Sequence, residues 1–202
     1  MIKVNPKDLS EQNNHKLLSA SVVPRPVAFV TTLNDDNTVN AAPFSFFGII
    51  SGYPPIISVS VLRRNEEMKD TARNILRNKE FVVNITNLDN VEKVNLTATE
   101  LKVNESEITL AKLNLVNSEI IKTPGVVETP IRLEVKLIKH QTFGDSNKTT
   151  VDNFIGEVVL FHLSKNVYDG NYVDFNKLKP IGRLAGNDFI TDKGLINIVR
   201  PK

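Results

Sequence analysis

The sequence predicts a mainly β protein with a few helices, in which antiparallel strands form one β-barrel. Runs of β-branched and aromatic residues recur along the chain, and clusters of turn formers separate them. Segments with helical spacing are fewer and interrupt the strands. Strand signals continue beyond residue 155 without a repeat, a low-complexity tract or a linker, so we expect residues 1–202 to form a single domain.

Four strands are predicted in the first half of the chain. Val27–Leu33 is followed by the turn formers Asn34–Asn37, so its partner strand should begin near Val39. Pro54–Leu62 opens with prolines, which cannot donate to a strand ladder and therefore mark the start of a strand. Glu80–Thr86 has the same β-branched and aromatic character and is the fourth strand.

Two long strands are predicted in the second half of the chain. In Pro130–Phe143 apolar residues alternate with charged ones, which is typical of an antiparallel strand with one wetter face. Asn153–Ser164 is the second long strand.

Three segments have the spacing of a helix. Ala72, Ile75 and Leu76 fall on one face of a helix within residues 69–78, with Asp70 or Thr71 as its N-cap. Residues 88–101 space their apolar side chains in a similar way, and residues 105–113 add one or two further turns. These helices are expected to decorate the barrel.

Composition and charge exclude several functional classes. The chain has no cysteine, which removes disulfides and thiolate chemistry and suits a reducing cytoplasm. Its formal charge of +2 and scattered lysines predict no nucleic-acid partner. There is no apolar leader and no run of about 18 apolar residues, so neither secretion nor membrane insertion is expected. We expect a cytoplasmic protein.

None of the three histidines is predicted to bind a metal, and the two that lie in strands, His140 and His162, are predicted to be structural. His15, His140 and His162 lie too far apart in sequence to indicate a metal site. A lone histidine in a strand is more often a hydrogen-bonded or surface residue than an acid–base catalyst. We therefore predict neither a metal site nor a catalytic side chain.

The start of the helix at residues 69–78 is a candidate anion site. A helix N-terminus exposes unpaired N–H groups and carries a partial positive charge, to which Lys69 adds a full charge and Thr71 a hydroxyl donor. The alternative is that Asp70 caps the helix, Lys69 is solvated and nothing binds.

The segment Asn40–Phe47 could form a ligand-binding loop beside that helix. Its small residues allow the backbone to approach a ligand closely, Pro43 stiffens it, and Ser45 offers another donor. Its three phenylalanines could instead belong to the core, and we expect that at least one of them does.

A series of motifs indicates a known family. In chain order they are "PRPVAFVTT" (24–32), "NAAPFSFF" (40–47), "YPPIISVSV" (53–61), "KDTARNI" (69–75), "EFVVNI" (80–85), "TPGVVETPIRLEV" (123–135), "IGEVVLFHL" (155–163) and "KPIGRLAGNDF" (179–189). This series resembles the flavin reductase-like proteins, which bind FMN in a split β-barrel. The resemblance covers nearly the whole chain, and its last motif, with Arg183 and Gly186, is most similar to the flavoredoxin branch.

The resemblance implies an FMN site on named residues. It implies that Lys69, Thr71 and Ser45 hold the phosphate, with Ser60 and Arg64 close by and Asp70 in the same motif. Arg25 and Thr32 would lie where the first strand approaches the flavin, and Asn40 and Ala41 would meet the edge of its ring. The family is usually homodimeric, with each flavin near the subunit boundary.

Three hypotheses for the function remain open. The first is an FMN-dependent oxidoreductase that passes electrons from NADH or NADPH to free flavin, a partner protein or a small acceptor. The second is an FMN-carrying electron-transfer protein, flavoredoxin-like, without direct NAD(P)H activity. Val151 stands where many short flavin reductases that use NADH carry a histidine, and Phe189 stands where the family often has a tyrosine. The third is a binding module that has kept only the barrel.

The segment Pro180–Phe189 is a candidate lid over the flavin. It is too rich in glycine for a strand interior, and Gly182 and Gly186 permit backbone turns around Arg183. The guanidinium of that arginine could pair with an anion or stack on a ring. The alternative is a surface turn in which Arg183 makes a weak exposed ion pair.

Overall fold

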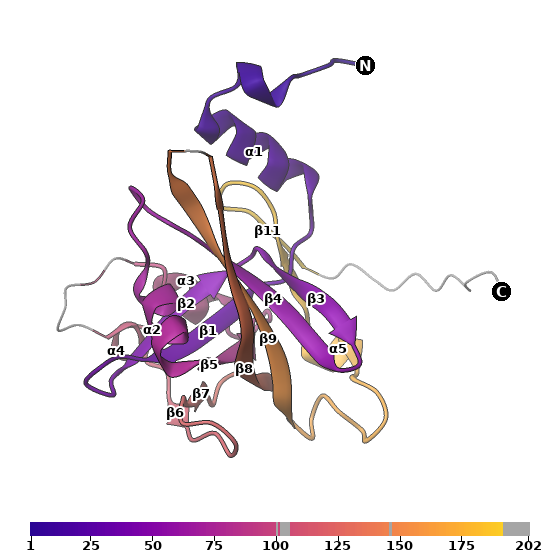
Figure 1. The fold of residues 1–202 in the computed structure, drawn as a ribbon. Helices are drawn as coiled ribbons and strands as arrows, with labels where there is room; N and C mark the ends of the chain where they lie inside the picture. The colour runs from indigo at the N-terminus through magenta and orange to yellow at the C-terminus, as the bar shows by residue number, and fades with distance from the viewer. Residues whose placement is uncertain (100, 102–105, 146, 192–202) are drawn as a thin grey trace.

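A seven-stranded antiparallel sheet is the framework of the part of the chain that the structure describes, residues 1–99, 101, 106–145 and 147–191 (Figure 1). The structure is a computed structural model. The strand order is β2-β1-β5-β8-β9-β4-β3. The strands are β1 (Ala28–Leu33), β2 (Val39–Phe44), β3 (Phe47–Gly52), β4 (Pro55–Leu62), β5 (Glu80–Ile85), β8 (Ile131–Gly144) and β9 (Thr149–Leu163).

The sheet curls so that its two edge strands meet. The edge strands β2 and β3 are consecutive in the chain, and only Ser45 and Phe46 lie between them. The backbone N–H of Ser60, on β4, donates to the carbonyl of Phe46 over 2.8 Å and so extends the pairing of β4 with β3 into this link. We call this junction the seam; it closes the sheet into the split barrel that the sequence predicts.

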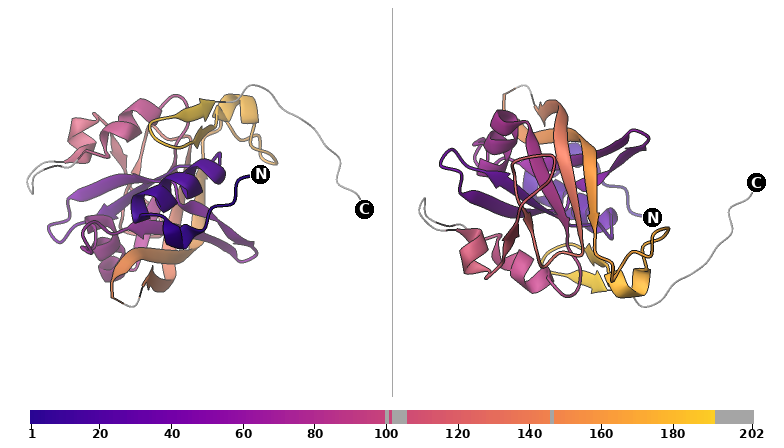
Figure 2. Two further views of the ribbon diagram at one scale, coloured as in Figure 1. Left: turned by 90° about the horizontal axis from the view of Figure 1, so that it is seen from above. Right: turned by 90° about the horizontal axis from the view of Figure 1, so that it is seen from below.

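Short helices and two small sheets surround the barrel (Figure 2). The helices are the 3₁₀ turn η1 (Pro6–Asp8), α1 (Glu11–Ser21), α2 (Asp70–Asn78), α3 (Val91–Leu96), α4 (Glu107–Leu110) and α5 (Phe175–Leu178). One small sheet pairs β6 (Leu115–Val116) with β7 (Gly125–Val126), and the other, the C-terminal hairpin, pairs β10 (Ile181–Arg183) with β11 (Phe189–Thr191). No described helix is long and apolar enough to cross a membrane.

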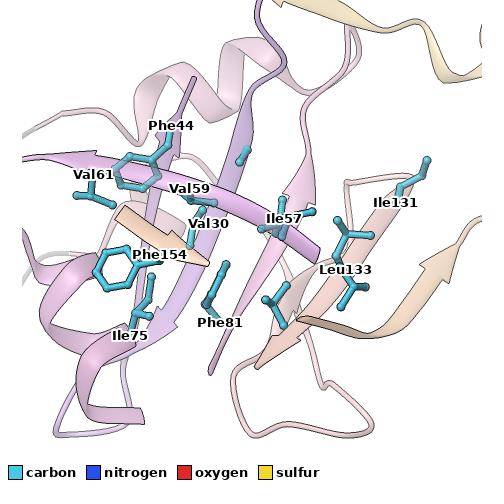
Figure 3. Close-up of a cluster of buried hydrophobic side chains, with 14 of the residues drawn as sticks. Val30, Phe44, Ile57, Val59, Val61, Ile75, Phe81, Ile131, Leu133 and Phe154 are labelled. Carbon is cyan, nitrogen blue, oxygen red and sulfur yellow. The ribbon is translucent and has the colours of Figure 1, made fainter. Parts of the chain in front are cut away.

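The barrel interior is filled by apolar side chains from the strands and from α2 (Figure 3). Val59 and Val61 of β4 are fully buried there, as is Phe154 of β9. Their strands follow the alternation of buried and less buried residues expected of an antiparallel sheet. Helix α2 adds Ala72 and Ile75 to the same cluster, which confirms its predicted apolar face and places its first turn at the barrel wall.

A second cluster covers the outer face of β1 and β2. Phe29 and Ala41 point away from the barrel interior and pack with Val94 of α3 and Ile108 of α4. Because side chains alternate along β2, its neighbouring residues face opposite ways, with Ala41 in this outer cluster and Phe44 in the inner one. The prediction that at least one phenylalanine of residues 40–47 is in the core is confirmed.

Most predicted elements are present, and three details need correction. The N-cap of α2 is Lys69, without a side-chain cap bond, so the assignment to Asp70 or Thr71 was wrong. Within residues 88–101, α3 covers only Val91–Leu96, and positions 100 and 102–105 lie outside the described residues. The C-terminal motif contains the strand β10 despite its glycines. Position 182 requires glycine because it lies against Pro24, where a Cβ would be only 2.3 Å from the proline ring.

Helix α1 was not among the predicted elements, although the sequence carries a signal for it. Ser10 is its N-cap, and its hydroxyl accepts a hydrogen bond from the backbone N–H of Asn13 over 3.2 Å. Only Ser19 is buried in this helix, so its apolar periodicity is too weak to reveal it. It lies across one end of the barrel (Figure 2, left), where Lys148 in the β8–β9 turn pairs with Glu11.

Candidate functional site

Three cavities adjoin along the seam, since all three are lined by Pro43 and Phe44, and we call them together the groove. The helix-start cavity, about 560 Å³, lies over the first turn of α2 and includes Arg64 and Lys69. The seam cavity, about 230 Å³, is lined by Ser45 and Ser60 among others. The hairpin cavity, about 240 Å³, lies between α3 and the C-terminal hairpin. Pro43 and Phe44 thus form the floor that all three share, and Ser45 extends it in the seam and hairpin cavities.

The helix-start cavity is cationic at the end of α2. No side chain caps this helix, so its first backbone N–H groups are not satisfied by a capping oxygen. Lys69 borders both the helix-start and the seam cavities. Its pKa is lowered by partial desolvation and by the nearby charge of Arg64. Two cations held this close to a helix N-terminus favour the binding of an anion such as a phosphate.

Asp70 does not neutralise this end of the helix by capping it. Its carboxylate pairs with Arg73 one turn further along, on the exposed side of α2. Asp70 lines the helix-start cavity with Arg73, so the cavity also contains an ion pair of its own. The alternative in which Asp70 caps the helix is therefore wrong.

A buried polar network fixes the start of α2 against β1 and β2. The side-chain amide of Asn40 donates to the hydroxyl of Thr71 over 2.8 Å and to that of Thr32 over 3.1 Å. Asn74, one turn along α2, donates to the same Thr32 oxygen over 3.1 Å. All four side chains are buried. Because each bond is made away from water, the network holds the helix terminus in one position relative to the sheet.

A second polar cluster supports the turn that carries Arg64. The guanidinium of Arg63 makes two bonds, of 2.8 and 3.0 Å, to the fully buried carboxylate of Asp152 on β9. His140 Nε2 lies 2.9 Å from the same carboxylate. The turn closes through backbone bonds between Arg64 and Glu67. We infer that this cluster positions Arg64 at the rim of the cavity.

Both strand histidines contact buried carboxylates within the sheet. His140 contacts Asp152 and stacks on Phe154, with 5.0 Å between the ring centroids. His162 Nε2 lies 2.6 Å from the buried carboxylate of Glu134. That carboxylate also accepts from the backbone N–H groups of residues 119–121, so it holds the loop before β7. Neither histidine lines the groove. Within the described residues, no cluster of three or more His, Asp or Glu side chains could hold a metal ion.

The seam cavity is organised around Arg25. Its buried guanidinium donates to the carbonyls of Ser19, Val22 and Leu184 over 2.5 to 2.9 Å. It also reaches the hydroxyl of Ser45, at 3.5 Å. Burial and the charge of Arg183 lower its pKa. Arg25 therefore ties the end of α1 and the C-terminal hairpin to the seam, and it adds positive charge to the cavity wall.

The hairpin cavity has a mostly apolar wall with a few polar groups. The guanidinium carbon of Arg183 lies 4.5 Å from the ring centroid of Phe189, and both residues line the cavity. Gly186 has a φ of 60°, a left-handed conformation that favours glycine, and its carbonyl accepts from Arg183. The turn predicted at Gly186 is therefore present.

The structure brings most of the predicted site residues to one groove. Ten of them line it: Arg25, Asn40, Ser45, Ser60, Arg64, Lys69, Asp70, Thr71, Arg183 and Gly186. Thr32 lies behind Asn40 and supports it, and Ala41 faces the outer cluster, with its neighbour Ala42 in the groove instead.

The groove residues that were not predicted from the sequence include His15, Thr86 and Asn95. His15, from α1, lies in the seam cavity near Phe46. Thr86 and Asn95 line the hairpin cavity. Thr86 directly follows the last residue of β5, and polar residues at strand ends often face sites. The other two carry no local signal, because they reach the groove from surface helices.

The fold and the groove define an antiparallel split-barrel protein with a cationic cleft at its seam. A family model described as a flavin reductase like domain matches residues 20–180. The chain therefore belongs to the flavin reductase-like family, as the motifs indicated.

The chain is similar to several known proteins over nearly its whole length. It is 45% identical to the protein YwrF of Bacillus subtilis over 96% of each chain. It is 42% identical to the structure of nitrilotriacetate monooxygenase component B from Bacillus cereus, with a TM-score of 0.95 and 98% of each chain covered. For 2-nitrobenzoate 2-nitroreductase NbaA from Pseudomonas fluorescens the identity is 28% and the TM-score 0.89, covering 99% of this chain and 96% of that one.

A structure of flavoredoxin from Desulfovibrio vulgaris shares the fold. Its TM-score is 0.75 at 23% identity, with 88% of this chain and 91% of that chain covered. At this level of identity the likeness concerns the barrel rather than the reaction.

We predict that Asp152→Asn destabilises the protein at neutral pH by about 1–3 kcal/mol, because Arg63 loses its charged partner in a partly buried site. Burial disfavours the Asp152 carboxylate, but bonds from Arg63 and His140 outweigh it and hold its pKa below the usual range. Its stabilisation is therefore complete above the unfolded-state pKa, about 3.9, and is lost as the pH falls through the lower folded-state value.

Urea unfolding between pH 7 and pH 2 measures this contribution. The variant should lose less stability than the natural chain on acidification. Asp35→Asn, which removes an exposed partner of Arg77, is the matched control and should cost at most about 0.5 kcal/mol. Equal acid sensitivity of the natural chain and Asp152→Asn would contradict the assignment.

Proposed function

We propose that this protein is an FMN-binding oxidoreductase that passes electrons from NADH or NADPH, through bound FMN, to free flavin, a partner protein or a small acceptor. The observation that carries the proposal is the gathering of Lys69, Arg64 and the uncapped start of α2 in the helix-start cavity. This donor set suits a phosphate dianion. Membership of the flavin reductase-like family supports a flavin as the group that bears this phosphate.

The phosphate would be held at the boundary between the helix-start and seam cavities. Lys69 borders both cavities and supplies a charge-assisted bond, and Ser45 and Ser60 line the seam cavity on its other side. The hydroxyl of Thr71 accepts from Asn40, so its own proton is left to donate toward the groove. Asp70 takes no direct part in this proposal, since its carboxylate is paired with Arg73.

The flavin ring would extend along Pro43–Ser45. FMN supplies the redox chemistry when it is bound, because its ring system can accept and release electrons. The protein's residues would bind and orient it: Asn40 is held in one orientation by Thr32 and Thr71, and Arg25 adds a fixed positive charge near the ring. Positive charge and donors stabilise a reduced, anionic ring, so they would tune its potential. Ala41 would contribute through its backbone alone.

The acceptor is proposed from the relatives and from the shape of the groove. The Bacillus cereus relative is described as component B of a monooxygenase, and the Pseudomonas fluorescens relative as a 2-nitrobenzoate 2-nitroreductase. The first supports a partner protein as acceptor, and the second supports a small molecule. The groove offers room for either, because its three cavities adjoin and the cofactor would fill only part of them.

A second candidate function is an FMN-carrying electron-transfer protein without direct NAD(P)H activity. The observation that favours it is Val151, which stands where NADH-using relatives carry a histidine. Val151 pairs with Leu62 and Phe143 inside the sheet and lines none of the three cavities. A nicotinamide at the groove would therefore have to be oriented by other residues, for which Arg183 is the candidate.

We predict that Lys69→Ala weakens FMN binding by about 10- to 150-fold, because one charge-assisted bond to phosphate contributes about 1.5–3 kcal/mol. Riboflavin, which lacks the phosphate, should bind both proteins within about twofold. Isothermal titration with the two ligands measures the difference. Lys139→Ala on the exposed face of β8 is the control and should change neither affinity. Equal losses for FMN and riboflavin would show that Lys69 does not contact the phosphate.

We predict that NADH or NADPH bleaches the visible absorbance of the FMN-loaded protein under anaerobic conditions, with one of them reacting faster. Stopped-flow mixing with each nucleotide measures this. If FMN is bound but neither nucleotide reduces it, the electron-transfer protein is the correct function. If the purified protein binds no flavin, the chain is a binding module and both proposals fail.

We predict a homodimer in solution, with residues 1–202 folding as a single domain in the cytoplasm and the flavin sites near the subunit boundary. The prediction rests on the family resemblance and on the prevalence of two-fold symmetric oligomers. Light scattering of the FMN-loaded protein measures its mass. A monomer that binds FMN tightly would contradict the idea that a partner subunit completes the site.

A further inference from the structure

The hairpin cavity is the part of the groove that the FMN site proposed above does not occupy. Of the residues assigned to FMN, only Ser45 lines it. The cavity nevertheless opens onto the same floor, through Pro43 and Phe44. We infer that this cavity is a separate subsite for a small planar carboxylate, an aromatic acid with one ring, which binds beside the flavin with its ring against α3 and its carboxylate toward Thr86 and Arg183.

Thr86 is the observation that indicates a ligand. Its side chain is only 4% exposed, and its hydroxyl is the one buried side-chain polar atom among the described residues without a hydrogen-bond partner. A buried hydroxyl with no partner is destabilising, and such groups are rare in folded proteins. Thr86 lines the hairpin cavity, so a ligand placed there can supply the missing partner. A carboxylate oxygen would accept a hydrogen bond from this hydroxyl.

The charge at this end of the groove favours an anion. Arg183 lines the hairpin cavity, and Arg25 lies in the next cavity, bridged to it by backbone bonds. Within the described residues, no carboxylate forms an ion pair with either arginine, and their guanidinium groups bond only to carbonyls and to the hydroxyl of Ser45. A small anion entering the cavity would therefore meet positive charge that no acidic side chain neutralises.

The size and walls of the cavity favour one flat ring. Val27, Val91, Val94, Ala98 and Phe189 supply apolar surface to its walls. A volume of about 240 Å³ is below the range of about 300–1,000 Å³ that drug-sized ligands occupy, so a single substituted ring suits it better than a dinucleotide. The stack of Arg183 on Phe189 gives the cavity a flat, cationic side wall.

Benzoate and benzamide test the subsite as a matched pair, because they share shape and differ in charge. The inference rests on the proposed function in one respect: FMN is taken to fill the helix-start and seam cavities. FMN affinity is therefore measured first. Benzoate is then titrated into the FMN-loaded protein and into the apoprotein by calorimetry. We expect saturable binding of benzoate to the loaded protein, at least about tenfold tighter than benzamide, because a charged partner strengthens the bond to arginine.

Two variants locate the binding site. Thr86→Val should weaken benzoate binding about threefold to tenfold while leaving FMN affinity unchanged, because one hydrogen bond is lost. Its apoprotein should melt at the same or a higher temperature, since the hydroxyl removed has no protein partner. Arg183→Gln should weaken benzoate about tenfold or more and remove the preference over benzamide. The control is Thr129→Val, which removes a buried hydroxyl bonded to Val126, so it should lower the melting temperature and leave benzoate affinity unchanged.

Each failure of the experiment has a distinct meaning. If FMN does not bind, the proposed function fails, and benzoate binding to the apoprotein alone then decides whether the cavity takes a carboxylate. If FMN binds but benzoate does not saturate, or binds no better than benzamide, the subsite inference is wrong. If Thr86→Val weakens FMN instead of benzoate, the cavity belongs to the cofactor. Loss of melting temperature in Thr86→Val with unchanged benzoate affinity would assign the hydroxyl a purely structural role.

Discussion

The closure of the barrel at a link of two residues is the constraint on which the rest of the structure depends. Ser45 and Phe46 connect strands at opposite edges of a seven-stranded sheet, so the sheet has to curl until those edges meet. The bond from Ser60 to Phe46 extends the pairing of β4 with β3 into that link. Because the strands cannot pair across the link itself, a cleft remains there, and its floor is the segment Pro43–Ser45.

Three elements from distant parts of the chain complete that cleft, and each is held by buried polar bonds rather than by apolar packing alone. Asn40, Thr32 and Thr71 fix the first turn of α2, and Arg25 fixes both α1 and the C-terminal hairpin through backbone carbonyls. A buried hydrogen bond is costly to leave unmade, so these elements have little freedom to shift relative to the seam. The groove is thereby preorganised, and its charges do not have to be gathered when a ligand enters.

The buried carboxylates that stabilise the sheet lie apart from the cationic side chains that line the groove. The buried carboxylates of Glu134 and Asp152 are satisfied within the sheet by histidines, by Arg63 and by backbone donors. Lys69, Arg25 and Arg183 face the groove, and among the described residues Asp70 pairs with Arg73 there, while Glu67 and Glu107 line only the helix-start cavity. This separation gives the cleft a positive character although the chain as a whole carries a formal charge of only +2.

The sequence alone determined six of the seven strands of the large sheet, all but β3, together with the helix at residues 69–78 and the family. Of the twelve site residues that it predicted, ten line the groove. Strand alternation and motif order are local properties, so they are readable without the fold. The tertiary structure decided what depends on contacts across the chain: that Ala41 turns outward, that Asp70 pairs with Arg73 instead of capping, and that α1 and the C-terminal hairpin close the cleft. It also decided that Thr86 lacks a partner, because a hydroxyl's surroundings are set by every element packed around it, and no local pattern encodes them.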